Sequence, residues 1–243
     1  EDLFTMSALT AQTTDAMLVP DFVTHSHQTI RGLYALLCGD VSKLNLDMPK
    51  AFEVIGDPRA DLCLPAQLAK AGWRTHFLQG AGLAFMGKDR VMPAIGFQEV
   101  HGSEWFTGPD EIPFQWGASD PAFFRGARQY ISELRAEGRP WMLTLMTVGT
   151  HQPYGVTDDL VKNYPNRLVA ATAILDRAVG EFLAGIKADG VLEDTLVILT
   201  SDESHGAPFA DWASSWGINI VLAPEQAQLP RLKHGTFGLI DME

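Results

Sequence analysis

The sequence predicts an α/β protein, a three-layer α/β/α arrangement with a mainly parallel central sheet. Two observations support this fold class. Continuous apolar runs of strand length occur at 140–148 (PWMLTLMTV) and 195–200 (TLVILT), which is typical of strands buried on both faces. Long amphipathic segments separate the apolar runs, and strands that alternate with helices indicate a sheet covered on both sides. We expect a single domain over residues 1–243, because no repeat, linker or low-complexity tract interrupts the chain.

Four segments are predicted to be helices. Residues 29–38 (TIRGLYALLC) carry apolar side chains at helical spacing, and residues 62–73 (LCLPAQLAKAGW) form an amphipathic pattern. Residues 120–137 make a third helix, for which Asp120 is a suitable N-cap. Residues 166–188 form a fourth and longer helix. These helices are expected to cover the faces of the sheet.

The strands are expected between these helices. Residues 74–79 (RTHFLQ) are predicted to form a short strand that ends in the glycine-rich turn 80–82. Residues 216–222 (WGINIVL) are a further candidate strand. We expect the strands at 141–148 and 195–200 to be parallel neighbours in one sheet.

Composition and charge restrict the class of partner. The chain has 243 residues, of which 46% are hydrophobic and 20% charged, as is usual for a globular protein. Its formal net charge of −12 argues against a nucleic-acid partner, because phosphate backbones require a basic surface. The overall field also repels anionic substrates, so such a substrate would need a local basic patch or a metal ion.

Targeting and redox signals leave alternatives open. There is no run of 18 apolar residues and no signal-peptide pattern at the start. We therefore expect either a cytoplasmic protein or one whose anchor or export signal lies outside the chain. Cys38 and Cys63 are the two cysteines. By count alone, they could form one disulfide in an oxidising compartment or remain as two buried thiols.

Three polar clusters lie where chemistry is expected in an α/β fold, beside strand ends or at a helix start. The first, 24–29 (THSHQT), runs into a predicted helix, whose N-terminus favours a tetrahedral anion. A hydroxyl there, such as that of Thr29, could be a nucleophile, or it could be a simple N-cap.

The other two clusters follow the apolar runs. His151 comes directly after the run at 140–148 and could bind anions or transfer protons, or it could be an ordinary loop residue. Asp202, Glu203 and His205 follow the run at 195–200 and suit a divalent metal, although an acidic loop that caps a helix is the alternative.

The order of these motifs resembles that of a known family. HQTIRGLYALLCGD, CLPAQLAKAGWRTHFLQGAGLAFMGKDRVMPAIGFQEVHG, LTLMTVGTHQPY and TLVILTSDESHG resemble successive blocks of lipoteichoic-acid-synthase-like phosphoglycerol transferases and related sulfatase-fold proteins. These proteins belong to the alkaline phosphatase superfamily. The resemblance runs in the right order from about Phe22 to His205. It implies an alkaline-phosphatase/sulfatase-like fold.

The resemblance also implies a nucleophile and a metal site. Thr29 matches the nucleophile, which attacks phosphorus to give a phosphothreonine intermediate. A divalent ion that also contacts Thr29 would lower the pKa of its hydroxyl. Asp202 matches a metal ligand, and the second ligand is either Glu203 or His205. The ion could be Mn²⁺, Mg²⁺ or Zn²⁺, since this ligand set does not choose among them.

Four residues are implied to contact the substrate. His151 matches the histidine that touches the transferred phosphoryl group. Lys88 lies near the position of a basic residue that binds substrate phosphate, and Arg31 is a further candidate anion contact. Gln79 stands where many relatives have a histidine, a departure that weakens the phosphoglycerol assignment.

Further expectations come from the same resemblance. The family's first strand ends in an acidic metal ligand several tens of residues before the nucleophile, whereas Glu1 precedes Thr29 by only 28 positions. We therefore expect a catalytic core truncated at both ends. In exported relatives, a bridge between the LCG and CLP cysteines is plausible, which predicts a disulfide between Cys38 and Cys63. Formylglycine sulfatase chemistry is disfavoured, because neither cysteine lies in a C/S-x-P-x-R motif.

The predicted function is a metal-dependent transferase or hydrolase of phosphoglycerol-type phosphate esters on lipid or glycan head groups. The alternatives are a phosphodiesterase, phosphatase or sulfuric-ester hydrolase on a soluble substrate, and a non-catalytic remnant of the fold. The leading prediction places the protein outside the cytoplasm, in the periplasm or on the outer face of the cytoplasmic membrane. It assigns membrane contact to segments outside this chain and leaves the oligomeric state open.

Overall fold

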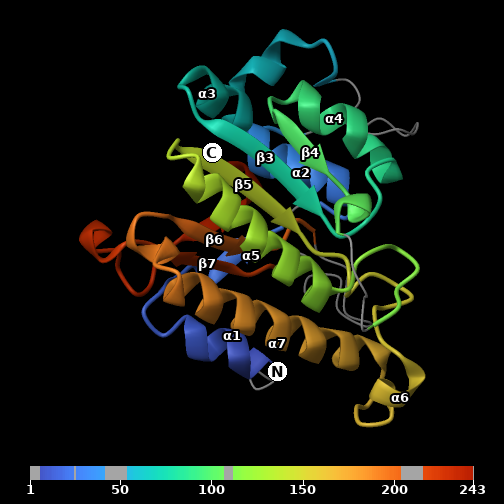
Figure 1. Cartoon of the computed structure of the whole chain (residues 1–243). Helices are drawn as coiled ribbons and strands as arrows, with labels where there is room; N and C mark the ends of the chain where they lie inside the picture. Colours follow the sequence, from blue (N-terminus) through green and yellow to red (C-terminus); the bar gives the residue numbers. More distant parts are fainter. Residues whose placement is uncertain (1–5, 25, 42–53, 107–111, 204–215, 243) are drawn as a thin grey trace. The chain divides into compact units, whose positions relative to one another are not determined.

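The computed structural model describes residues 6–24, 26–41, 54–106, 112–203 and 216–242 (Figure 1). The chain divides into two compact units. Unit 1 comprises Glu1–Thr14, Trp73–Phe85 and Gln98–Val191, and unit 2 comprises Asp15–Gly72, Met86–Phe97 and Leu192–Glu243. Each unit is assembled from three separated stretches of the chain, so neither is contiguous in sequence. The single domain expected over residues 1–243 stays a prediction, and the two units are described separately.

Unit 1 contains a parallel sheet of three strands. Strand β3 (Arg74–Gln79) lies between β4 (Glu99–His101) and β5 (Trp141–Met146). The register aligns Arg74 with Trp141 and Gln79 with Met146. Strand β3 is buried from its second residue to its last, as befits a central strand. The strand predicted at 74–79 is therefore confirmed at both ends.

The α-helices described in unit 1 pack against one another. They are α1 (Ser7–Gln12), α5 (Asp120–Ala136), α6 (Asp158–Val161) and α7 (Arg167–Ala188), and Figure 1 shows α1 lying along α7. The ring centroids of Phe124 and Phe182 lie 4.9 Å apart between α5 and α7. The carboxylate of Asp176 on α7 accepts the backbone N–H groups of Ala8 and Leu9. The helices predicted at 120–137 and 166–188 are thus confirmed to within one residue.

In its described residues, unit 2 combines three α-helices with two small sheets. Its helices are α2 (Thr29–Cys38), α3 (Leu64–Lys70) and α4 (Lys88–Ala94). Strand β7 (Asn219–Leu222) pairs antiparallel with β1 (Met17–Leu18) and β6 (Val197–Thr200), and β2 (Asp21–Val23) pairs parallel with β8 (Thr236–Gly238). A core of Val19, Phe22, Ala35 and Leu239 joins α2 to the second sheet.

Short 3₁₀ helices complete the connections of the chain. They are η3 (Pro58–Leu62), η4 (Phe85–Gly87), η5 (Ser103–Trp105), η6 (Val191–Glu193), η8 (Glu225–Ala227) and η9 (Leu239–Asp241). The helix predicted at 62–73 is shorter than expected, because Leu62 ends η3 and Gly72, with φ +90°, lies beyond α3. Within the described ranges, no helix combines the length and the apolar character that a membrane crossing needs.

The disulfide predicted from the family resemblance is confirmed. Cys38, the last residue of α2, is bonded to Cys63, which directly precedes α3. Cys63 is almost completely buried and Cys38 nearly so. The bridge therefore ties the C-terminal end of the helix that begins at Thr29 to the next helix of unit 2.

The burial predicted for two strands was wrong. Strand β5 is only half-buried at every position, and in β6 the side chain of Ile198 is 42% exposed. Each is the last strand in the order of its own sheet, β4-β3-β5 and β1-β7-β6. Pairing between the two strands stays a prediction, because they belong to different units. The strand predicted at 216–222 is confirmed over Asn219–Leu222, although it runs antiparallel to β6.

Candidate active site

The candidate site in unit 2 begins at the first turn of α2. Gln28 is the N-cap residue and makes no side-chain capping bond, and Thr29 is the first helical residue. The Thr29 side chain is buried, and its hydroxyl donates a hydrogen bond of 3.2 Å to Oε1 of Glu203. The alternative interpretation of Thr29 as an N-cap is therefore wrong. Its hydroxyl serves a tertiary contact across 174 residues of sequence.

The segment after β6 carries the two carboxylates. Strand β6 ends at Thr200, and Asp202 and Glu203 follow in the loop. The backbone of Asp202 lies against Gly32 on α2, so closely that a Cβ atom at residue 32 would collide with the Asp202 carbonyl oxygen. Glycine at position 32 is thus needed for this approach. It lies one turn after Thr29, which places the hydroxyl beside the carboxylates.

Lys88 joins the same cluster from α4. It is the first residue of that helix, after Gly87 at φ 62°, and its side chain is only 2% exposed. Burial lowers the pKa of Lys88 to about 8, although the charges of Asp202 and Glu203 act in the opposite direction. Burial and the neighbouring Glu203 charge raise the pKa of Asp202 to about 6. Opposite charges therefore face each other in a buried setting, where electrostatic interactions are strong.

The donor set fits a divalent cation. The Thr29 hydroxyl and the Asp202 and Glu203 carboxylates are oxygen donors, which hard divalent ions prefer. The two carboxylates are adjacent and Asp202 is half-buried, so a bound cation would relieve the energetic cost of keeping both ionised. Among the described residues, no group of three or more His, Cys, Asp or Glu side chains is placed to hold a metal. His205, the other predicted ligand, lies outside the described residues.

Arg31 stays a prediction as an anion contact. It lies in the first turn of α2, two residues after Thr29, and its side chain is half-buried. Its backbone N–H donates to the carbonyl of Gln28 at 3.0 Å, as the first turn of a helix requires. Arg31 therefore lies on the helix that begins with Thr29, and its contact with an anion stays a prediction.

Gln79 and His151 belong to unit 1. Gln79 is buried at the end of β3, and its amide donates to the carbonyl of Gly82 at 2.9 Å, so it braces the glycine-rich turn. His151 lies in the loop after β5, with Nδ1 2.8 Å from the carbonyl oxygen of Gln152. That oxygen can only accept, so Nδ1 carries a hydrogen and Nε2 is the atom left for a substrate. Participation of Gln79 and His151 in the Thr29 site stays a prediction.

The sequence did not reveal the structural roles of two unit 1 residues, Trp116 and Asp120, at the loop after β5. Trp116 donates its indole N–H to the same carbonyl of Gln152 at 2.9 Å, and its ring centroid lies 4.8 Å from that of His151. Asp120 was expected to be an N-cap, which was wrong. Ser119 is the N-cap, and Asp120 Oδ1 accepts the backbone N–H of Gly149 at 3.1 Å. An aspartate followed by proline at a helix start was the one available signal, and it fits capping equally well.

The chain resembles known proteins in sequence and in fold. A family model described as Sulfatase matches residues 2–242. The chain belongs to the sulfatase family. It is 27% identical over 220 residues to a phosphoglycerol transferase I from Xanthomonas axonopodis pv. citri, covering 81% of this chain and 30% of that protein. The chain thus spans between about a quarter and a third of the length of the curated relatives it matches.

Solved structures show the same fold. The lipoteichoic acid synthase LtaP from Listeria monocytogenes superposes with a TM-score of 0.84 at 17% identity, covering 98% of this chain and 64% of that one. The C-terminal periplasmic domain of EcEptC from Escherichia coli, solved in complex with Zn, gives a TM-score of 0.68 at 13% identity, with coverages of 98% and 73%. The predicted family resemblance, the α/β fold class and the sulfatase-like enzyme type are therefore confirmed.

Proposed function

We propose that this chain carries the catalytic core of a metal-dependent enzyme that transfers or hydrolyses phosphoglycerol-type esters through Thr29. The observation that carries the proposal is the buried hydroxyl of Thr29, which begins α2 and donates to Glu203 instead of capping the helix. A hydroxyl is a weak nucleophile unless a neighbouring group activates it. Here a carboxylate is in contact with it, with a second carboxylate and a lysine close by.

The chain's own residues account for the covalent step. Thr29 Oγ1 forms a bond to phosphorus while the bond from phosphorus to the leaving alcohol breaks, and the hydroxyl proton departs along its hydrogen bond to Glu203. The leaving alkoxide takes a proton from solvent. An acceptor hydroxyl or water then attacks phosphorus and loses its proton to solvent, while the bond from phosphorus to Thr29 Oγ1 breaks and Thr29 takes its proton back from Glu203. A divalent ion held by Thr29, Asp202 and Glu203 would lower the pKa of the hydroxyl and offset the phosphate charge.

Lys88 supplies the positive charge that the substrate needs. With a net charge of −12, the molecule as a whole repels a phosphate ester. A pKa of about 8 keeps most of the Lys88 side chain protonated at pH 7. Its burial makes that charge more effective than an exposed one, because little water screens it. Arg31 and His151 are proposed as further contacts to the phosphoryl oxygens.

The comparisons support the proposed substrate class and location. The Xanthomonas relative is a phosphoglycerol transferase, and one structural neighbour is a lipoteichoic acid synthase. We therefore propose phosphate esters on lipid or glycan head groups as substrates. The disulfide between Cys38 and Cys63 supports a site outside the cytoplasm, because disulfides persist in oxidising compartments. Membrane attachment is assigned to segments outside this chain. The proposed ion is one of Mn²⁺, Mg²⁺ or Zn²⁺, and one structural neighbour was solved with Zn.

The test is to trap the covalent intermediate. The protein is incubated with p-nitrophenyl phosphoglycerol and Mn²⁺, quenched in acid and measured by intact mass spectrometry. We expect release of p-nitrophenol and a mass increase of one phosphoglycerol group, which tryptic mapping places on Thr29. Thr29→Ala should show neither, and Thr29→Ser should keep part of both. Thr172→Ala is the control, because its hydroxyl bonds only within α7.

Three outcomes separate the alternatives. An adduct on another residue would contradict the role of Thr29. Turnover without any adduct, equal in Thr29→Ala, would favour a direct hydrolytic reaction on a soluble ester. Binding of Mn²⁺ without adduct or turnover would favour a non-catalytic remnant of the fold.

A further inference from the structure

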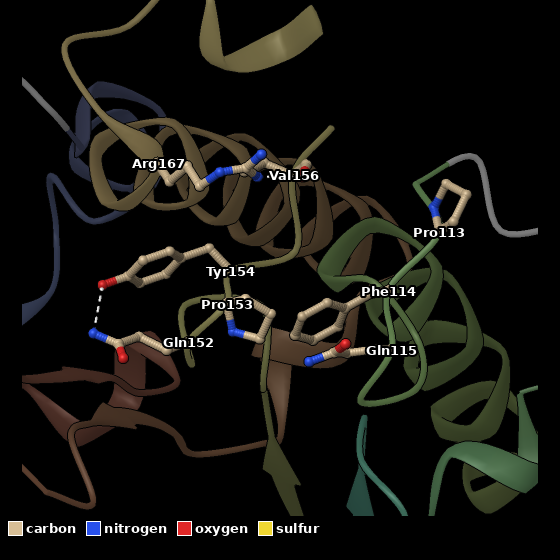
Figure 2. A pocket seen from close by; sticks show the side chains of 8 residues that line it. All are labelled: Pro113, Phe114, Gln115, Gln152, Pro153, Tyr154, Val156 and Arg167. Carbon is tan, nitrogen blue, oxygen red and sulfur yellow. Dashed lines mark hydrogen bonds between the residues drawn. The ribbon is translucent and has the colours of Figure 1, made fainter. Parts of the chain in front are cut away.

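Unit 1 contains an open cavity that the proposed reaction does not use. Its volume is about 670 Å³, within the range usual for small-molecule sites. It is lined by Pro113, Phe114, Gln115, Gln152, Pro153, Tyr154, Val156 and Arg167. These residues come from the segment before α5, the loop after β5 and the start of α7 (Figure 2). All of them lie in unit 1, so the cavity is defined within that unit alone.

The lining alternates flat apolar surfaces with neutral hydrogen-bonding groups. In Figure 2, Pro153 lies between the rings of Tyr154 and Phe114, and the amides of Gln115 and Gln152 lie beside them. The Gln152 amide donates to the Tyr154 hydroxyl at 3.3 Å, which holds the two polar ends together. Flat rings with a polar rim match a pyranose, whose C–H faces are apolar while its edge carries hydroxyl groups.

The charge around the cavity is balanced, which argues against an anionic ligand. Arg167 bears the only formal charge of the lining at neutral pH, and it is paired with Asp158 of α6. It also donates to the carbonyl of Val156 at 3.2 Å. Next to this pair, Lys162 is bonded to Asp159 at 2.6 Å. Two acidic and two basic side chains thus neutralise one another, so the attraction for a phosphate is weak.

The backbone of this cavity is firmly held. Trp116 donates to the carbonyl of Gln152, and the backbone N–H of Gly155 donates to the carbonyl of Gly149 at 2.7 Å. The N–H of Tyr154 donates to the carbonyl of His151 at 2.7 Å. A preformed wall of this kind reduces the entropy lost when a ligand binds.

We propose that this cavity is a binding site for a neutral saccharide. The rings of Phe114 and Tyr154 stack on sugar faces, and Gln115, Gln152 and Arg167 donate to sugar hydroxyl groups. The site would hold the glycan part of a substrate or acceptor, and this role rests on the proposed function. The binding itself does not depend on Thr29.

The experiment measures binding of defined neutral sugars. Maltotriose and cellotriose are titrated into the protein and followed by saturation-transfer difference NMR and calorimetry, with glycerol 1-phosphate as the anionic comparator. We expect at least one trisaccharide to bind in roughly the millimolar range, with saturation passing to its ring protons. Glycerol 1-phosphate should not compete with it.

Single substitutions test whether the trisaccharide binds in this cavity. Phe114→Ala should weaken trisaccharide binding roughly two- to tenfold, as the loss of one aromatic contact does. Tyr164→Ala is the matched control, because Tyr164 is a partly exposed aromatic residue outside the cavity lining. Gln115→Ala, at an exposed side chain, is the second variant if Phe114→Ala unfolds. Asp158→Asn should leave trisaccharide binding within about twofold, and it should allow glycerol 1-phosphate to compete with the trisaccharide, because the Arg167 charge is no longer paired.

The outcomes separate this proposal from the proposed function. Absence of binding for both trisaccharides, an equal loss in Tyr164→Ala, or displacement of the bound trisaccharide by glycerol 1-phosphate would each overturn the saccharide site. Thr29→Ala should bind trisaccharide normally. If the phosphothreonine forms but no sugar binds, the cavity proposal fails alone. If sugar binds but no adduct forms, only the proposed reaction and the role that depends on it fail.

Discussion

The starts of α2 and α7 differ in how the chain uses its polar side chains. At α7, Asn166 is the N-cap and its side chain accepts the backbone N–H of Val169 at 2.9 Å. At α2, the N-cap Gln28 makes no such bond, and the hydroxyl of Thr29 is directed to Glu203 instead. Both helices were predicted from the sequence. One start serves the helix itself, and the other serves a distant loop.

This difference gives a physical criterion for a functional helix start. A capped start satisfies its backbone donors locally, and its side chain is then occupied. A start without a side-chain cap keeps its donors available for an anion, and the adjacent hydroxyl is free to meet carboxylates from another element. Near α2, the buried Lys88 and the half-buried Asp202 both have shifted pKa values, which is an independent sign of a functional site.

The largest expected effect is a difference in turnover between variants at the two helix starts. Thr29→Ala removes the proposed nucleophile, so we expect turnover of p-nitrophenyl phosphoglycerol to fall by at least about 10³-fold. Asn166→Ala should leave turnover unchanged, because Asn166 only caps its own helix. Initial rates at saturating substrate are the measurement. Comparable losses in the two variants would show that both starts are structural.

The second effect concerns the contact between α2 and Asp202. Gly32→Ala places a methyl group against the Asp202 carbonyl, which forces the backbone to move. We expect the free energy of unfolding to fall by about 1–3 kcal/mol, as for other overpacked sites, with a loss of activity. Denaturant titration measures the first and initial rates the second. Gly82→Ala is the matched control, because a Cβ there meets nothing within 4 Å. A stability loss at Gly82 as large as that at Gly32 would contradict the proposed collision.

The third effect compares the two N-caps directly. Asn166→Ala should lower the free energy of unfolding by about 1 kcal/mol, the usual effect of losing a side-chain cap. Gln28→Ala should change it by only a few tenths of a kcal/mol, since Gln28 makes no capping bond. Both values come from urea unfolding at one pH. A larger loss at Gln28 would mean that the start of α2 is capped after all.

Local structure was largely readable from the sequence. Helix α2 and strand β3 have the predicted bounds, because periodicity and the glycines at 39 and 80 define their ends. The sequence could not decide between a nucleophile and an N-cap for Thr29, since the answer depends on where Glu203 lies in space. The position of Asp120 was misjudged for the same reason, because its partner is Gly149.

Burial was the least predictable property. The apolar runs that became β5 and β6 were expected to be buried on both faces, yet β5 is only half-buried and Ile198 of β6 is 42% exposed. Apolar composition reports what a strand can bury, and sheet order decides what it does bury. The saccharide cavity is likewise invisible in sequence, because it joins segments around residues 114, 153 and 167 through tertiary contacts.

The smallest expected effect tests whether a buried titratable group always belongs to a functional site. His76 on β3 is buried, with Nδ1 2.7 Å from the hydroxyl of Tyr130, and burial lowers its pKa below the usual 6.5. The unfolded chain therefore binds a proton near pH 6.5 that the folded chain binds only at lower pH. Folded-state stability should fall as pH drops below about 6.5, by at most about 1.4 kcal/mol per pH unit. Urea unfolding between pH 7.5 and 5.5 measures this slope, which should be shallower in His76→Phe and unchanged in His234→Gln, where the histidine is exposed.

An equal slope in His76→Phe would mean that other groups cause the acid sensitivity. A shallower slope with unchanged turnover would mark His76 as structural, in contrast to the buried Lys88 and the half-buried Asp202 in the Thr29 site.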